Sequence, residues 1–132
     1  MTALVIERLR TRAQFLAVRN GARAPRPTVL VEAKRRAGSG PIGLGLTATK
    51  KIGGAVVRNR ARRRLREAAR RLLPLHGLAG VDYVLVARQS TPEAAWEALL
   101  DDLQSALIRL AAALESGESP PQARAPKRPS RK

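Results

Sequence analysis

The sequence of 132 residues lacks cysteine and contains only one phenylalanine, one tyrosine and one tryptophan. Without cysteine the chain can form neither a disulfide scaffold nor a thiolate zinc site. Three aromatic residues are too few for a platform on which successive RNA bases stack. There is no run of 18 apolar residues and no signal-peptide pattern, so a cytoplasmic protein without a membrane span is expected.

Acidic residues are also scarce, with 10 Asp plus Glu against 26 Lys plus Arg and a net charge of +16. The excess is uneven. Residues 50–71 hold ten basic residues and one acidic, whereas residues 72–115 hold two basic and six acidic. A compositional bias of the whole genome would not leave an acidic segment beside a basic one. Such a local concentration of positive charge attracts polyanions, of which nucleic acid is the most common.

Apolar periodicity and capping residues predict three helices. The first is expected over about 12–19, because residues 11–14 have the spacing of a capping box. The main helix is expected over about 55–73, ended by Pro74. A long last helix is expected to follow the cap and proline at residues 90–93.

Three strands are expected, over 28–33, 42–49 and 81–87, with a Gly-rich turn joining the first two as an antiparallel hairpin. The second strand places small residues on one face, which would let another backbone approach closely. Together the elements predict a two-layer α/β (α+β) sandwich with a small mixed sheet, as one RNA-binding domain over residues 1–115. Residues 116–132, rich in Pro, Ser, Lys and Arg, are expected to form a disordered basic tail.

No constellation of residues suited to catalysis stands out, and no catalytic or metal-ligating residue is predicted. His76, the single histidine, is expected in a loop after the main helix. Asp101 and Asp102 are adjacent, so on a helix they diverge by about 100° and are expected on a solvated face rather than around one ion. Asp82 is expected to pair with a neighbouring arginine.

The basic run places Arg58, Arg62 and Arg66 in one line at i, i+4 spacing. Like charges at this spacing repel, so a helix that carries so many favours an anionic partner. Arginine in particular suits two-point contact with phosphate. Further arginines are expected to widen this line into one positive face: Arg60, Arg63, Arg64, Arg70 and Arg71.

The stretch from Lys50 to Glu67 closely resembles the signature of the bacterial ribonuclease P protein family, K-K-x-G-x-A-V-x-R-N-R-x-(K/R)-R-x-x-R-E. The resemblance covers about residues 8–112 and takes in Arg8-Leu9, Phe15 and Asp82-Tyr83-Val84. It implies the small subunit of a ribonucleoprotein that removes the 5′ leader from precursor tRNA. The chemistry would belong to the RNA subunit and the magnesium ions bound mainly by it. A left-handed crossover through the main helix is also implied.

By position, the resemblance implies two sets of binding residues. A cleft between the first helix and the sheet would hold the single-stranded leader, through Phe15, Arg12 and Arg19. Arg19 and Thr28 stand where many members carry aromatic residues, so leader binding is expected to be weaker and more dependent on charge. The catalytic RNA and precursor tRNA are the implied partners, with no protein partner required and no membrane. Contact with the catalytic RNA is implied for Lys50, Lys51, Arg58, Asn59, Arg60, Arg62, Arg63 and Arg66.

Three alternatives remain open from the residues alone. A structural RNA-binding protein of the ribosomal type would share the charge but have no effect on precursor tRNA cleavage. A magnesium-dependent nuclease acting alone would need Asp82 or Asp101. An amphipathic membrane-surface protein fits poorly, because the arginine face is opposed by a modest Ala/Leu stripe without aromatic residues.

Overall fold

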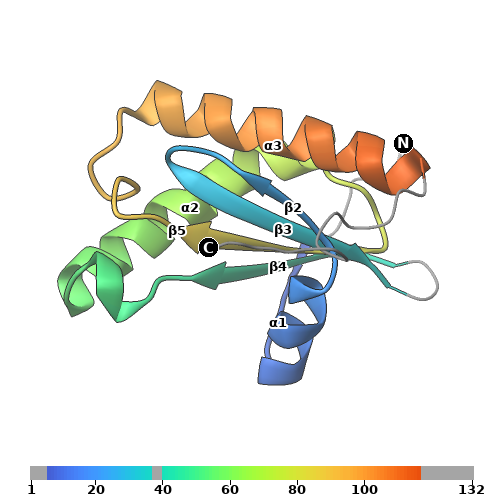
Figure 1. The fold of residues 1–132 in the computed structure, drawn as a ribbon, viewed down its shortest axis with the longest axis horizontal. Helices are drawn as coiled ribbons and strands as arrows, with labels where there is room; N and C mark the ends of the chain where they lie inside the picture. The colour runs from blue at the N-terminus through green and yellow to red at the C-terminus, as the bar shows by residue number, and fades with distance from the viewer. Residues whose placement is uncertain (1–5, 37–39, 117–132) are drawn as a thin grey trace, which may run out of the picture.

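The computed structural model describes residues 6–36 and 40–116. Its five strands form one sheet in the order β1-β4-β5-β3-β2 (Figure 1). β4 runs parallel to β1 and β5, and β3 runs antiparallel to β5 and β2. The mixed sheet and the α/β class are therefore as predicted. The elements in chain order are β1 (Ile6–Arg8), α1 (Arg12–Arg19), β2 (Ala22–Pro25), β3 (Val29–Arg35), β4 (Ile42–Thr47), the 3-10 helix η1 (Lys50–Ile52), α2 (Ala55–His76), β5 (Val81–Ala87) and α3 (Trp96–Ser116).

The predicted hairpin of the two strands now labelled β3 and β4 is wrong, because β5 lies between them. β5 pairs with β3 along its whole length, from Val29↔Ala87 to Arg35↔Val81, and with β4 on its other side. Almost every residue of β5 is buried, as expected of a central strand covered on both faces. Turn residues report only local connections, so they could not reveal a strand inserted from later in the chain.

The two edge strands, β1 and β2, were not predicted and are only three and four residues long. In β2 the buried residues Ala22 and Ala24 alternate with the exposed Arg23 and Pro25. A proline is tolerated there because one side of an edge strand needs no hydrogen-bond donor. Strands this short carry too few residues for a period-two pattern to be seen.

Helix α2 continues past Pro74 to His76, so the predicted stop at the proline is wrong. Proline lacks the N–H that would bond to the carbonyl four residues earlier. Here it lies in the last turn and is exposed, so the loss affects a helix end that already has free carbonyls. The Gly77 amide closes the turn by donating to the Leu73 carbonyl at 2.7 Å. His76 is therefore the last helical residue, not a loop residue.

The cap expected at residues 90–93 forms a separate turn, and α3 begins only at Trp96. The Ser90 carbonyl accepts from the Ala94 amide at 2.8 Å. Thr91 is fully buried, and its hydroxyl donates to the Thr28 carbonyl at 2.6 Å. This tertiary hydrogen bond holds the turn against the start of β3, which a local capping pattern cannot indicate.

The two faces of the sheet are covered unequally. Tyr83 and Leu85 face α2 and α3, which bury the main core. Val84 points to the opposite face and packs with Leu9 and Val18 beneath the eight-residue α1. Figure 1 shows α3 and α1 on opposite sides of the sheet. The predicted layers of sheet and helices are thus formed by α2 and α3, and the short α1 leaves part of the other face open.

The connection from β4 through α2 to β5 joins two parallel neighbours. Its left hand stays a prediction from the resemblance. None of the helices within the described residues is long and apolar enough to cross a bilayer. The predicted tail lies outside the described residues, apart from Ser116 at the end of α3.

Candidate nucleic-acid interface

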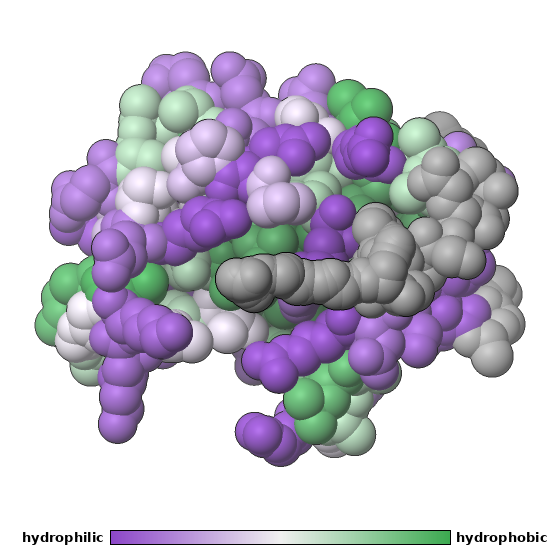
Figure 2. Space-filling view, viewed as in Figure 1, coloured by the Kyte–Doolittle hydropathy of each residue, from purple (hydrophilic) through white to green (hydrophobic). Residues whose placement is uncertain are grey.

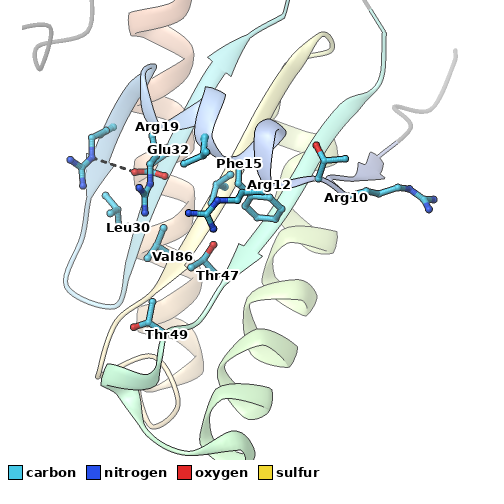
Figure 3. A pocket seen from close by; sticks show the side chains of 13 residues that line it. Arg10, Arg12, Phe15, Arg19, Leu30, Glu32, Thr47, Thr49 and Val86 are labelled. Carbon is cyan, nitrogen blue, oxygen red and sulfur yellow. Dashed lines mark ion pairs between the residues drawn. The ribbon is translucent and has the colours of Figure 1, made fainter.

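A cleft of about 740 Å³ lies between α1 and the open face of the sheet (Figure 3). Arg12, Phe15 and Arg19, the three residues predicted to bind the leader, line it from α1. Their spacing of three and four places them on one side of the helix. The sheet contributes apolar side chains to the lining, among them Leu30 and Val86.

The predicted capping box sets where α1 begins, and it is confirmed. The Gln14 amide donates to the Thr11 hydroxyl at 3.2 Å, and the Gln14 side chain accepts from the Thr11 amide at 2.9 Å. These bonds satisfy backbone donors of the first turn that have no partner within the helix. They fix the start of the helix that carries the cleft residues.

The Phe15 ring packs across the backbone of Gly45 in β4. A Cβ atom placed on Gly45 would lie only 2.5 Å from the ring. At Gly43 it would meet the side chains of Asp82 and Leu9. The small residues of β4 were expected to admit another backbone, but they admit side chains instead. Phe15 is thereby held half-buried at the floor of the cleft.

Glu32 also lines the cleft, and sequence analysis did not single it out. Its carboxylate lies 3.6 Å from the Arg23 Nε atom. Burial raises the pKa of Glu32, while the charges of Arg23 and Arg19 act in the opposite direction. The alternation of β3 already placed Glu32 on the same face as Leu30, which was the available signal.

The α2 arginines line hollows on two sides of the helix. Arg62 and Arg66 border a groove of about 440 Å³ along β1 and β4, which Phe15 also lines. The cleft beneath α1 and the groove bordered by Arg62 and Arg66 therefore meet at Phe15. Lys50 and Lys51 lie in η1 just before the helix and are exposed.

Other members of the predicted RNA-contact set lie toward α3. Arg60 and Arg63 line a hollow that also contains Trp96. Arg60 forms an exposed ion pair with Glu93 at 3.2 Å. The predicted contact residues thus wrap around α2 rather than occupying a single face.

Arg64 is directed into the protein, which corrects the expectation that it widens the positive face. Its guanidinium donates to the carbonyls of Thr91, Pro92 and Ala94 at 2.6–3.0 Å. It also lies 5.7 Å from the centre of the Trp96 ring, within the range of a cation–π contact. Arg64 therefore ties α2 to the turn before α3.

Arg71 also has partners within the protein, although its side chain is 57% exposed. It pairs with Glu67 at 3.2 Å and lies 5.5 Å from the Trp96 ring centre.

Arg62 and Asn59 contact each other, with the guanidinium donating to the amide oxygen at 2.9 Å. The Nε atom of Arg58 is buried and has no hydrogen-bond partner among the described residues.

Of the three aspartates considered above, Asp101 is exposed, as expected, and the other two have partners within the protein. Asp82 forms an ion pair with Arg36, as expected. Asp102 accepts from the Thr28 amide at 3.0 Å and the Thr28 hydroxyl at 2.7 Å, so its predicted solvated position is wrong. Within residues 6–36 and 40–116 no three His, Asp or Glu side chains gather as metal ligands would.

Comparison with known proteins identifies the family. The family model described as Ribonuclease P matches residues 6–111. The ribonuclease P protein component of Caulobacter vibrioides is 50% identical over 115 residues, which are 86% of this chain and 77% of that protein. The corresponding protein of Ruegeria pomeroyi is 48% identical over 105 residues, covering 77% of this chain and 84% of that protein.

The fold is similar as well. The RNase P protein from Thermotoga maritima has a TM-score of 0.67 and 26% identity, covering 78% of this chain and 96% of that one. The chain therefore belongs to the ribonuclease P protein family, the protein subunit of the endoribonuclease that processes the 5′ ends of tRNA with an RNA partner.

Proposed function

We propose that α2 and η1 dock on the catalytic RNA while the cleft beneath α1 holds the 5′ leader of precursor tRNA. The observation that supports two adjoining RNA-binding surfaces is the position of Phe15. This residue lines both the cleft beneath α1 and the groove bordered by Arg62 and Arg66. An RNA strand leaving the cleft past Phe15 would meet Arg62 and Arg66 at once. One domain thus carries both surfaces.

The surface chemistry of the cleft suits a single strand. Arg12 and Arg19 supply positive charge for phosphates, and Phe15 supplies a partly exposed ring against which a base can stack. Figure 2 shows mostly hydrophilic side chains on the viewed face, with a hydrophobic patch over α1. Leu16 of α1 is 41% exposed and also lines the cleft.

Among residues 6–36 and 40–116, the acidic side chains do not gather into a site for magnesium. Asp82 is neutralised by Arg36, and Asp102 is hydrogen-bonded to Thr28. A magnesium ion bound by protein is normally held by carboxylates together with waters or substrate phosphates. The ions that support cleavage are therefore assigned to the RNA subunit, and the protein's part is to bind and orient.

The decisive experiment measures cleavage of a precursor tRNA at low magnesium by a bacterial ribonuclease P RNA alone, by the protein alone, and by both together. Cleavage only in the combined reaction is the expected result. Cleavage by the protein alone would show a solitary nuclease. Binding without faster cleavage would show a purely structural RNA-binding protein.

The docking surface is tested separately by the affinity of the protein for the RNA subunit. Arg62→Ala is expected to weaken binding by about 1–3 kcal/mol, the range for a charge-assisted contact. Arg109→Ala is the matched control, because Arg109 is an exposed residue of α3 and lines none of the three hollows. Equal losses in the two variants would mean that net charge, rather than the α2 surface, determines binding.

A further inference from the structure

We propose that Glu32 selects the leader nucleotide in the cleft by accepting hydrogen bonds from the Watson–Crick edge of a guanine. This rests on the proposed binding of the leader in the same cleft. Glu32 is a specificity-determining residue in this view, and its carboxylate is the acceptor that the base would reach.

The carboxylate belongs to β3, the strand next to the edge strand β2, and lies on the face that α1 leaves open. Its neighbours across the strands are Arg23 of β2 and Val84 of β5. Its side chain is only 9% exposed, yet it contributes to the cleft lining. Figure 3 shows Glu32 beside Arg19, with its dashed ion pair to an arginine on the other side. A ligand in the cleft would therefore contact this acid from the open side.

The hydrogen-bonding capacity of Glu32 is largely unfilled. The 3.6 Å separation from Arg23 is an ion pair too long for a hydrogen bond. No other described residue donates a hydrogen bond to its carboxylate. Burial also raises its pKa, a sign that the charged form is poorly solvated. The carboxylate oxygens are not fully enclosed by the protein but reach the cleft that Glu32 lines, where donors on a ligand can bond to them.

A nucleobase suits this position better than a phosphate does. A phosphate would be repelled by the carboxylate and attracted by Arg12 and Arg19 around it. The base between two phosphates is then free to point toward Glu32. Single-stranded RNA is commonly read in this way, by hydrogen bonds to the Watson–Crick edges of unstacked bases.

Guanine is the base whose edge matches a carboxylate. Its N1–H and N2 amino groups are adjacent donors, so they can bond to both carboxylate oxygens, which accept only. Adenine and cytosine each present an amino donor next to a ring nitrogen that accepts, and uracil places its single N–H between two carbonyls. The second carboxylate oxygen would face an acceptor in all three cases.

The test uses the reconstituted holoenzyme and precursor tRNAs whose leader is uniformly uridine except for one variable nucleotide, moved along the leader. The wild-type protein is expected to bind guanosine at one position roughly 5- to 150-fold more tightly than uridine, the range for one bidentate base contact. Inosine, which lacks the N2 amino group, is expected to lose most of this preference. Absence of any guanosine preference would overturn the proposal without requiring a variant.

Glu32→Gln separates base reading from charge. A glutamine offers one donor and one acceptor, which match the Watson–Crick edges of adenine and cytosine, so this variant is expected to lose the guanosine preference and gain affinity for adenosine and cytidine at the same position. Glu32→Ala is expected to lose the preference without gaining another. The matched control, Glu97→Gln on the exposed start of α3, is expected to leave the preference intact. Equal changes for all four bases in Glu32→Gln would show that Glu32 acts only through its charge, and would overturn the proposal.

The same measurements distinguish this proposal from the one on which it depends. The affinity of each holoenzyme for a leaderless tRNA reports correct folding and assembly. If the wild-type protein binds precursor and leaderless tRNA equally, leader binding itself fails and base selection fails with it. If the leader contributes but its bases do not matter, only the role of Glu32 is overturned.

Discussion

Arg64 and Arg66 lie two positions apart on α2, yet only the Arg64 side chain is hydrogen-bonded within the part of the protein that the structure describes. Arg64 donates to three carbonyls and lies against Trp96. Arg66 is exposed and borders the hollows on both sides of the helix. Two positions turn a helix by about 200°, so the first side chain meets the turn before α3 and the second meets solvent. Arg66 therefore keeps its donors free for a ligand, whereas those of Arg64 are taken up by backbone carbonyls of the protein itself.

The largest effect that this comparison predicts is on stability. Arg64→Ala leaves three carbonyls without their donor and removes the contact with Trp96, so the free energy of unfolding is expected to fall by about 1.5–3 kcal/mol. Arg66→Ala is expected to change it by less than about 0.5 kcal/mol, as is usual for a surface substitution. Urea unfolding followed by far-UV circular dichroism measures both. Equal stabilities of the two variants would contradict the interpretation that Arg64, but not Arg66, stabilises the fold.

The converse effect is expected on binding. Arg66→Ala should weaken affinity for the RNA subunit by about 1–3 kcal/mol, because it removes a charged donor that no described residue engages. Arg64→Ala, measured at a temperature where the variant is folded, should bind nearly as the wild type does. Filter binding at physiological salt compares them. A greater loss for Arg64→Ala would show that its intramolecular bonds yield to RNA.

The line of Arg58, Arg62 and Arg66 could be predicted from the sequence, because helical periodicity alone fixes which side chains share a side. The inward turn of Arg64 could not, because its acceptors belong to the turn at residues 91–94. That turn is held by the tertiary hydrogen bond of Thr91.

The same limit applies to the sheet and the cleft. The strands with long apolar patterns were predicted, and so was α1 with its capping box. The insertion of β5 between β3 and β4 was not, since strand order depends on contacts distant in sequence. Glu32 was missed for a related reason. The alternation of side chains along β3 showed on which face of the sheet Glu32 lies. That α1 is too short to cover this face could be seen only in the structure.

The salt dependence of RNA affinity is expected to differ between the Arg64 and Arg66 variants, although by a smaller effect. Each phosphate that the protein neutralises releases counterions, so affinity for RNA falls as salt rises. Arg66→Ala is expected to lower the slope of log affinity against log salt by about 1, the contribution of one phosphate contact. Arg64→Ala is expected to leave the slope unchanged. A shallower slope for Arg64→Ala would place its guanidinium on a phosphate.

The smallest effect concerns Arg60, which is intermediate between the two cases because its partner Glu93 is itself 77% exposed. Exposed ion pairs contribute only about 0.2–1 kcal/mol, so RNA can compete for this arginine. Glu93→Gln releases Arg60 and removes a negative charge near the RNA, and affinity for the RNA subunit should rise by less than about 1 kcal/mol.

Glu97→Gln removes the same charge from an exposed residue of α3 that forms no ion pair among the described residues, and serves as the control. A gain confined to Glu93→Gln would show that an exposed intramolecular pair only weakens an arginine as an RNA ligand. A loss would mean that Glu93 positions Arg60 for RNA. An arginine with a partner inside the protein could then also bind RNA. The contrast between Arg64 and Arg66 would apply only where the partner is a buried acceptor, as it is for Arg64.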